Sequence, residues 1–122
     1  MYEKKIPLDT SCGLRLTLDA IGGKWKSYIL EELRHGPKRP SEIKRGIGCA
    51  NSRVVLQQLK ELMMYGMVEK KAFDENVFHS EYSVTELGRS AFPIIDTLRS
   101  WGESHKSGIE DIIRSRVDDC YR

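Results

Sequence analysis

Residues 37–60 have the sequence PKRPSEIKRGIGCANSRVVLQQLK, and this segment decides the fold. It predicts a short helix over residues 42–45, with Ser41 as its N-cap, followed by a glycine-containing turn. A longer helix over residues 51–65 comes next, with Asn51 as its N-cap. Serine and asparagine suit these positions because their side-chain oxygens accept hydrogen bonds from the free N–H groups of a first helical turn. The segment therefore predicts two helices joined by a tight turn.

The positive charge of the chain is concentrated in the same segment. The whole chain has 20 basic and 18 acidic residues, of which six bases and the single acid Glu42 lie here, so the segment has a net charge of +5 and the remainder −3. The six bases are Lys38, Arg39, Lys44, Arg45, Arg53 and Lys60. Such a concentration predicts binding to a polyanion. The alternative interpretation is a solvated helix face.

Composition limits the class of protein. With 122 residues, 39% hydrophobic and 31% charged, the chain is expected to form one helix-rich globular domain. Charge-free runs such as residues 62–68 are far shorter than the ~18 apolar residues of a membrane span. Residues 1–5 lead into no apolar segment, so no secretion signal is expected. Cys12, Cys49 and Cys120 are too few and too scattered for a disulfide framework, which favours a cytoplasmic location.

Two amphipathic helices are predicted before the basic segment, because apolar residues recur there at intervals of three and four. The first carries Leu14, Leu18 and Ile21 on one face. It is expected to end at residues 22–23, because glycine readily adopts the left-handed conformation found after helix C-termini. The second helix is expected from about Lys24 to His35.

After Gly66 the pattern becomes that of β-strands. Strands are predicted over residues 67–73 and 80–84, with a turn at residues 74–76. Helices followed by a two-stranded antiparallel hairpin form a mainly α fold, the winged helix-turn-helix. In that fold the short helix crosses the DNA backbone and the helix over residues 51–65 enters the major groove. The basic residues lie on these two elements, so charge and topology both favour DNA as the polyanion.

The outward face of the helix over residues 51–65 supplies candidate base contacts. Arg53 and Gln57 lie four residues apart and point the same way. Arginine can bind guanine and glutamine can bind adenine through paired hydrogen bonds, and Leu56 suits a thymine methyl group. Residues expected to contact phosphates or to flank the site are Ser52 and Lys60 on this helix, and Lys38, Arg39, Ser41, Lys44 and Arg45 before it.

The last helical region begins at Thr85. We expect Pro93 to bend it and Gly102 and Gly108 to divide it. Two apolar stripes would stay uncovered in a monomer, and we expect them to pair across a two-fold axis in a homodimer. The stripes are Leu14, Leu18 and Ile21, and Ile109, Ile112, Ile113 and Val117.

Four short motifs occur in a fixed order along the chain. They are IGGKW at 21–25, GPKR at 36–39, the segment from Leu59 through Leu62 to Val68, and YSVTELG at 82–88. Together they resemble the HxlR family of bacterial winged-helix transcription regulators, a MarR/HxlR-like group, over residues 12 to about 105. The resemblance implies a single domain over residues 1–122 and a dimer paired through helices at about 10–21 and 86–119.

Two positions depart from the family pattern. Cys12 is followed by Gly13 where the family has proline, and residues 79–80 lack the basic residue common before the family's Glu-Tyr pair. Residues 74–75 are acidic, so the hairpin is expected to make at most a marginal phosphate contact, through Lys70 or Lys71.

Cys12 is a candidate sensor of oxidants. It begins a helix, where the helix dipole favours a thiolate. Several members of the resembled family sense oxidants or electrophiles with a cysteine at this position, so the resemblance implies a switch. The alternative, a small buried hydrophobic residue, has equal weight. Cys49, in the turn before Asn51, is a second candidate position.

Other classes of function have little support in the sequence. The three histidines are scattered, and no close Cys/His spacing predicts a metal site. No cofactor motif is evident, and no nucleophile is placed with a base and an orienting acid, so an enzyme is not expected. The main rival is a winged-helix adaptor that binds proteins rather than specific DNA. An adaptor has no need of the clustered bases.

Overall fold

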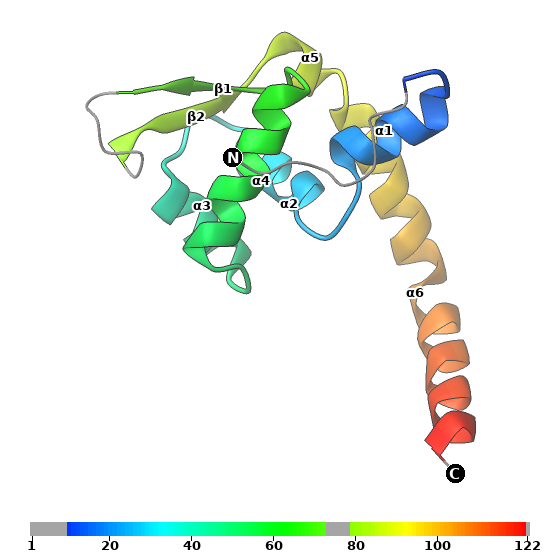
Figure 1. Ribbon diagram of the computed structural model, residues 1–122. Helices are drawn as coiled ribbons and strands as arrows, with labels where there is room; N and C mark the ends of the chain where they lie inside the picture. Colours follow the sequence, from blue (N-terminus) through cyan, green and yellow to red (C-terminus); the bar gives the residue numbers. More distant parts are fainter. Residues whose placement is uncertain (1–9, 73–78, 122) are drawn as a thin grey trace. The chain divides into compact units, whose positions relative to one another are not determined.

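The structure is a computed structural model that describes residues 10–72 and 79–121, with side chains up to Val117. Its elements, in chain order, are α1 (Gly13–Ile21), α2 (Lys26–Glu32), α3 (Pro40–Ile47), α4 (Ser52–Met64), β1 (Val68–Lys71), β2 (Glu81–Val84), α5 (Glu86–Arg89) and α6 (Phe92–Tyr121) (Figure 1). The fold is therefore mainly helical with an antiparallel hairpin, as predicted. The chain divides into two compact units at Ala91 and Phe92.

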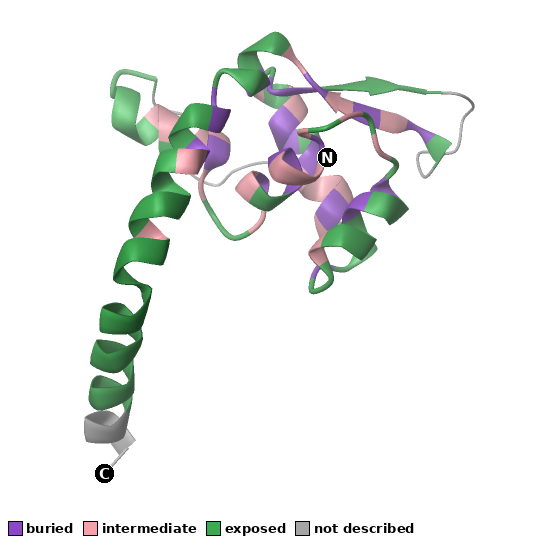
Figure 2. Ribbon diagram, turned by 180° about the vertical axis from the view of Figure 1, so that it is seen from behind, coloured by how far each residue is buried: buried purple, intermediate pink, exposed green. Residues whose placement is uncertain are grey.

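The core of the first unit lies between α2, α3 and α4, which pack on one another. Its fully buried apolar side chains are Ile29, Leu30, Leu33, Ile43, Val55, Leu59 and Leu62. Figure 2 shows this buried face turned inward and the opposite helix faces exposed. Removing one such side chain from water contributes about 1.5–3 kcal/mol, so these three helices form the stable part of the unit. Val55, Leu59 and Leu62, spaced by four and three residues, form the buried stripe of α4.

α4 begins and ends where the sequence predicts. The Asn51 side chain accepts a hydrogen bond from the Val54 N–H at 2.9 Å. After the last helical residues, Gly66 has a φ of +74°, a left-handed conformation that few other residues adopt without strain. These two signals are local, so the sequence alone could locate them.

The start of α3 differs from the prediction. Ser41 is not the N-cap, because α3 already begins at Pro40, with Arg39 as N-cap. Proline suits a first helical position, since its ring presets φ and the absent N–H has no partner there. The Glu42 carboxylate instead accepts a hydrogen bond from the Arg39 N–H at 2.9 Å. α2 is also shorter than expected, ending at Glu32 rather than His35.

The hairpin pairs β1 with β2 in antiparallel register, with Val68 opposite Val84. The backbone of Lys38 joins it: the Lys38 N–H donates to the Tyr82 carbonyl at 3.0 Å, and the Tyr82 N–H donates to the Lys38 carbonyl at 2.9 Å. The hairpin is therefore tied to the segment just before α3. The predicted turn at residues 74–76 lies outside the described residues. Burial raises the pKa of the Tyr82 phenol.

Thr85 connects the hairpin to the end of α4. Its hydroxyl donates to the Gly66 carbonyl at 2.6 Å and accepts from the Gly88 N–H at 3.0 Å, which caps α5. The sequence correctly identified Thr85 as a helix start.

α6 is one continuous helix of 30 residues, so the predicted division at Gly102 and Gly108 is wrong. A glycine costs a helix interior about 1 kcal/mol but does not break it. The last helical region is interrupted at residues 90–91, between α5 and α6, so the change expected at Pro93 comes just before it. Pro93 itself lies in the first turn of α6, where its missing N–H disrupts no helical hydrogen bond. No helix within the described ranges is long and apolar enough to cross a membrane.

Candidate nucleic-acid interface

All ten residues predicted to bind DNA lie at the surface of the first unit, on α3, on α4 or just before α3. Seven are exposed: Arg39, Ser41, Lys44, Arg45, Ser52, Arg53 and Lys60. Three are half-buried: Lys38, Leu56 and Gln57. Because α3 packs against α4, the structure brings the two sets of basic residues onto adjoining helices (Figure 1). Because Leu56 is half-buried, only part of its side chain is available to contact a thymine methyl group.

Most of the basic side chains at this site form no ion pair with the residues that the structure describes. Within residues 10–72 and 79–121, five of them take part in no side-chain hydrogen bond or ion pair. These five are Arg39, Lys44, Arg45, Arg53 and Lys60. An unpaired cation at the surface can approach a phosphate without first losing an internal partner, so these residues are the positive charge available to a polyanion.

Lys38 differs from the other five bases. Its ammonium lies 2.9 Å from Oε1 of Glu32, the last residue of α2. Its backbone is also held by Tyr82, as described above. Much of its charge is therefore already balanced, and the structure ranks Lys38 below the others as a phosphate contact. The sequence could not show this, because Glu32 lies outside the basic segment.

The first turn of α4 presents the candidate base contacts. Asn51 caps the helix, and Ser52 and Arg53 follow it directly, both exposed. Gln57 lies one turn further along and is half-buried. N-terminal residues of a recognition helix are those that reach base edges in the major groove. Arg53 is therefore the best-placed residue of this structure for reading a base.

A buried polar cluster behind α4 was missed in the sequence. Lys26 of α2 is 7% exposed, and its Nζ lies 2.8 Å from Oε1 of Glu61, which is 4% exposed. The same Nζ donates to Oε1 of Gln58 at 3.1 Å. One signal was available: Lys26 precedes the buried Ile29 by three positions, so it lies on the apolar stripe of its helix.

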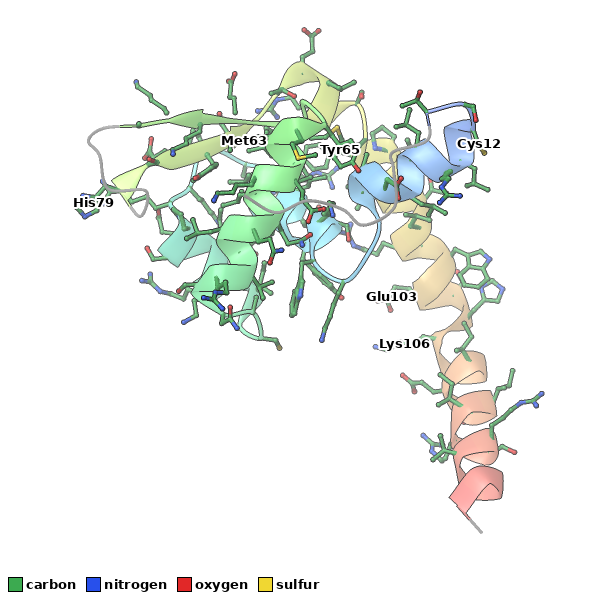
Figure 3. All side chains as sticks on the ribbon, in the orientation of Figure 1. Cys12, Met63, Tyr65, His79, Glu103 and Lys106 are labelled. Atoms are coloured by element: carbon green, nitrogen blue, oxygen red, sulfur yellow. The ribbon has the colours of Figure 1, made fainter. Side chains whose placement is uncertain are left out.

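Cys12 lies at the N-terminal end of α1 (Figure 3), where its backbone carbonyl accepts from the Leu16 N–H at 2.9 Å. Its side chain makes no capping hydrogen bond and is exposed. The alternative of a buried hydrophobic residue is therefore wrong for the single chain. Cys49 is exposed as well, in the turn between α3 and α4. Among described residues, no group of three or more His, Cys, Asp or Glu could hold a metal ion.

The two predicted apolar stripes have different outcomes. On α1, Leu14 and Leu18 are exposed, but Ile21 is buried and so does not belong to an uncovered face. On α6, the exposed large apolar residues are Ile94, Leu98, Trp101, Ile109, Ile112, Ile113 and Val117. The α6 stripe is therefore longer than predicted. Trp101 stacks on His105 of the same helix, with the ring centres 4.6 Å apart.

Known proteins are similar to this chain in sequence. A model of the HxlR-like helix-turn-helix family matches residues 20–110. YkvN of Bacillus subtilis (strain 168), an uncharacterized HTH-type transcriptional regulator, is 45% identical over 92 residues, covering 75% of this chain and 78% of that protein. YybR of the same organism, described in the same way, is 37% identical over 112 residues, covering 90% of each.

Solved structures of regulatory proteins have a fold similar to that of this chain. The redox regulator HypR in its reduced form has a TM-score of 0.74 and 35% identity to this chain, covering 82% of this chain and 99% of that one. The unpaired bases on α3 and α4 thus lie on the helix-turn-helix part of a recognised fold. The chain belongs to the HxlR-like helix-turn-helix family of transcriptional regulators.

Proposed function

We propose that this regulator binds double-stranded DNA sequence-specifically, with α4 in the major groove. The observation that carries the proposal is the group of five basic side chains, on and beside α3 and α4, that pair with no residue in the described part of the chain. Arg53 and Gln57 read base edges, and Leu56 contributes the apolar part of its half-buried side chain. The remaining polar residues hold phosphates and set the position of the protein: Arg39, Ser41, Lys44, Arg45, Ser52 and Lys60, with a smaller share for Lys38.

The binding unit in this proposal is a cytoplasmic homodimer. Apolar residues exposed on α1 and along α6 support it, because a run of this kind on a helix surface favours pairing with a partner. A two-fold dimer buries the same residues twice and sets its recognition helices about 34–36 Å apart, one turn of DNA. The operator is then an inverted repeat.

The test compares Arg53→Ala with Lys60→Ala on two duplexes, one selected by the wild-type protein from a randomised pool and one of random sequence. Arg53→Ala should lose about 1–3 kcal/mol on the selected duplex and little on the random one. Lys60→Ala should weaken both equally. Lys106→Ala, an exposed base on α6 (Figure 3), is the matched control and should change neither. A wild type that enriches no sequence from the pool and does not bind the random duplex would favour the protein-binding adaptor instead.

A thiol switch at Cys12 is a second part of the proposal. The exposed position of Cys12 supports it, as does the similarity to HypR, which is described as a redox regulator. Oxidation or alkylation of the thiol adds bulk or charge at α1, and a shift of a few ångströms between subunits would misplace base contacts that need paired hydrogen bonds.

The switch is tested by measuring DNA affinity before and after mild peroxide or quinone treatment. Treatment should weaken wild type and Cys49→Ser and leave Cys12→Ser unchanged. Equal affinity of the wild type before and after treatment would remove the switch. Protection by Cys49→Ser alone would move it to the turn before α4.

A further inference from the structure

A buried ion pair joins α2 to the proposed recognition helix. Nζ of Lys26 lies 2.8 Å from Oε1 of Glu61 and 3.1 Å from Oε1 of Gln58, so one ammonium holds two side chains a turn apart on α4. The side chains of Lys26 and Glu61 are 9% and 5% exposed. α2 lies beside α4 and contacts it (Figure 1).

The ion pair is not explained by the stability of either helix alone. Lys26 is the first residue of α2, where the positive end of the helix dipole disfavours a cation. The neighbouring core is already apolar, with Ile29, Leu30 and Leu59 fully buried. A buried ion pair stabilises a fold no more than well-packed apolar residues do, because both charges lose their hydration. Its best-attested use is to select one packing arrangement.

Hydrogen bonds can select one packing arrangement because they are directional, whereas apolar contacts tolerate rotation of one helix on another. Glu61 follows Arg53 by eight residues, or about 12 Å along the helix axis at about 1.5 Å per residue. A tilt of α4 by about 5° about Glu61 therefore moves Arg53 by about 1 Å. A displacement of this size is enough to spoil a pair of hydrogen bonds to one base.

We propose that Lys26 is a positioning residue for DNA recognition: by holding Gln58 and Glu61, it sets the angle of α4 and hence the placement of Arg53. This role rests on the proposed DNA binding. It makes Lys26 and Glu61, which lie behind the contact surface, determinants of sequence specificity. The phosphate contacts are less affected, because a point charge tolerates a shift that paired hydrogen bonds do not.

The test uses the double variant Lys26→Met/Glu61→Met, which replaces the pair with apolar side chains and is expected to stay folded. The ratio of affinities for the wild-type-selected duplex over random DNA should fall by about 5-fold to 150-fold, with the salt dependence unchanged. Ile29→Val trims the same core, keeps the pair and should leave the ratio unchanged. An unchanged ratio in the folded double variant overturns the positioning role. If the double variant does not fold, Gln58→Ala decides, and an unchanged ratio there overturns it equally.

A second measurement without DNA separates this inference from the proposed function. Backbone amide resonances of residues 52–57 should shift in the double variant and stay near wild type in Ile29→Val. Absence of DNA binding by the wild type would remove the proposed function. Unshifted resonances in the double variant would overturn the positioning of α4, whatever the wild type binds.

Discussion

The salt dependence of DNA binding should distinguish two lysines that the sequence treats alike. Lys60 is exposed and pairs with no described residue, whereas Nζ of Lys38 is 2.9 Å from the carboxylate of Glu32. Each phosphate that a base neutralises adds about −0.9 to the slope of log affinity against log salt. Four phosphate contacts per subunit, from Arg39, Lys44, Arg45 and Lys60, give about −7 for a dimer.

Lys60→Ala removes one contact per subunit and should flatten the slope by about 1.8. Lys38→Ala should flatten it by less than half as much, since Glu32 already balances that charge. Fluorescence anisotropy of a labelled duplex over a range of salt concentrations measures both slopes. Glu32→Gln releases Lys38 and should steepen the slope, and Lys106→Ala should not alter it.

Two results would refute this reasoning. Equal flattening by Lys60→Ala and Lys38→Ala would show that Glu32 does not hold Lys38 away from phosphates. A wild-type slope near zero would contradict DNA binding through this surface altogether. The comparison is meaningful only between variants of equal thermal stability, which circular dichroism melting establishes first.

Three further predictions concern stability. Glu61→Leu leaves the Lys26 ammonium buried without its counter-ion. It should lower the free energy of unfolding by about 3–5 kcal/mol in urea titrations, and a loss below about 1 kcal/mol would contradict the buried pair. Gly88→Ala should cost about 1–3 kcal/mol in the same assay, because its new Cβ would overlap the carbonyl oxygen of Met67, and unchanged stability would show that α5 can move freely. Burial raises the pKa of Tyr82, so its phenol resists ionisation in the folded state. The free energy of unfolding should therefore be unaffected below the ordinary pKa of 10.0 and should fall as the pH rises above it. The fall should be smaller in Tyr82→Phe.

Sequence reasoning was most accurate where the determining signals are local. The cap at Asn51, the end of α4 at Gly66 and the start of α5 at Thr85 were all located correctly. Each depends on hydrogen bonds or backbone angles within about four residues, so the neighbouring residues in the sequence are enough to predict it. The buried stripe of α4 follows in the same way from helical periodicity.

Tertiary structure decided which charges are available and which are already used. Lys38 lies six positions after Glu32, in the segment between α2 and α3, and Lys26 and Glu61 are 35 positions apart. No local pattern pairs such residues, because their distance is set by how α2 packs against its neighbours. The sequence by itself therefore determined the helix-turn-helix order and the basic surface. Only the tertiary structure showed that Lys38 of that surface is balanced by Glu32, and that Lys26, outside it, is buried behind α4. The physical reason is that ion pairs depend on distances through space.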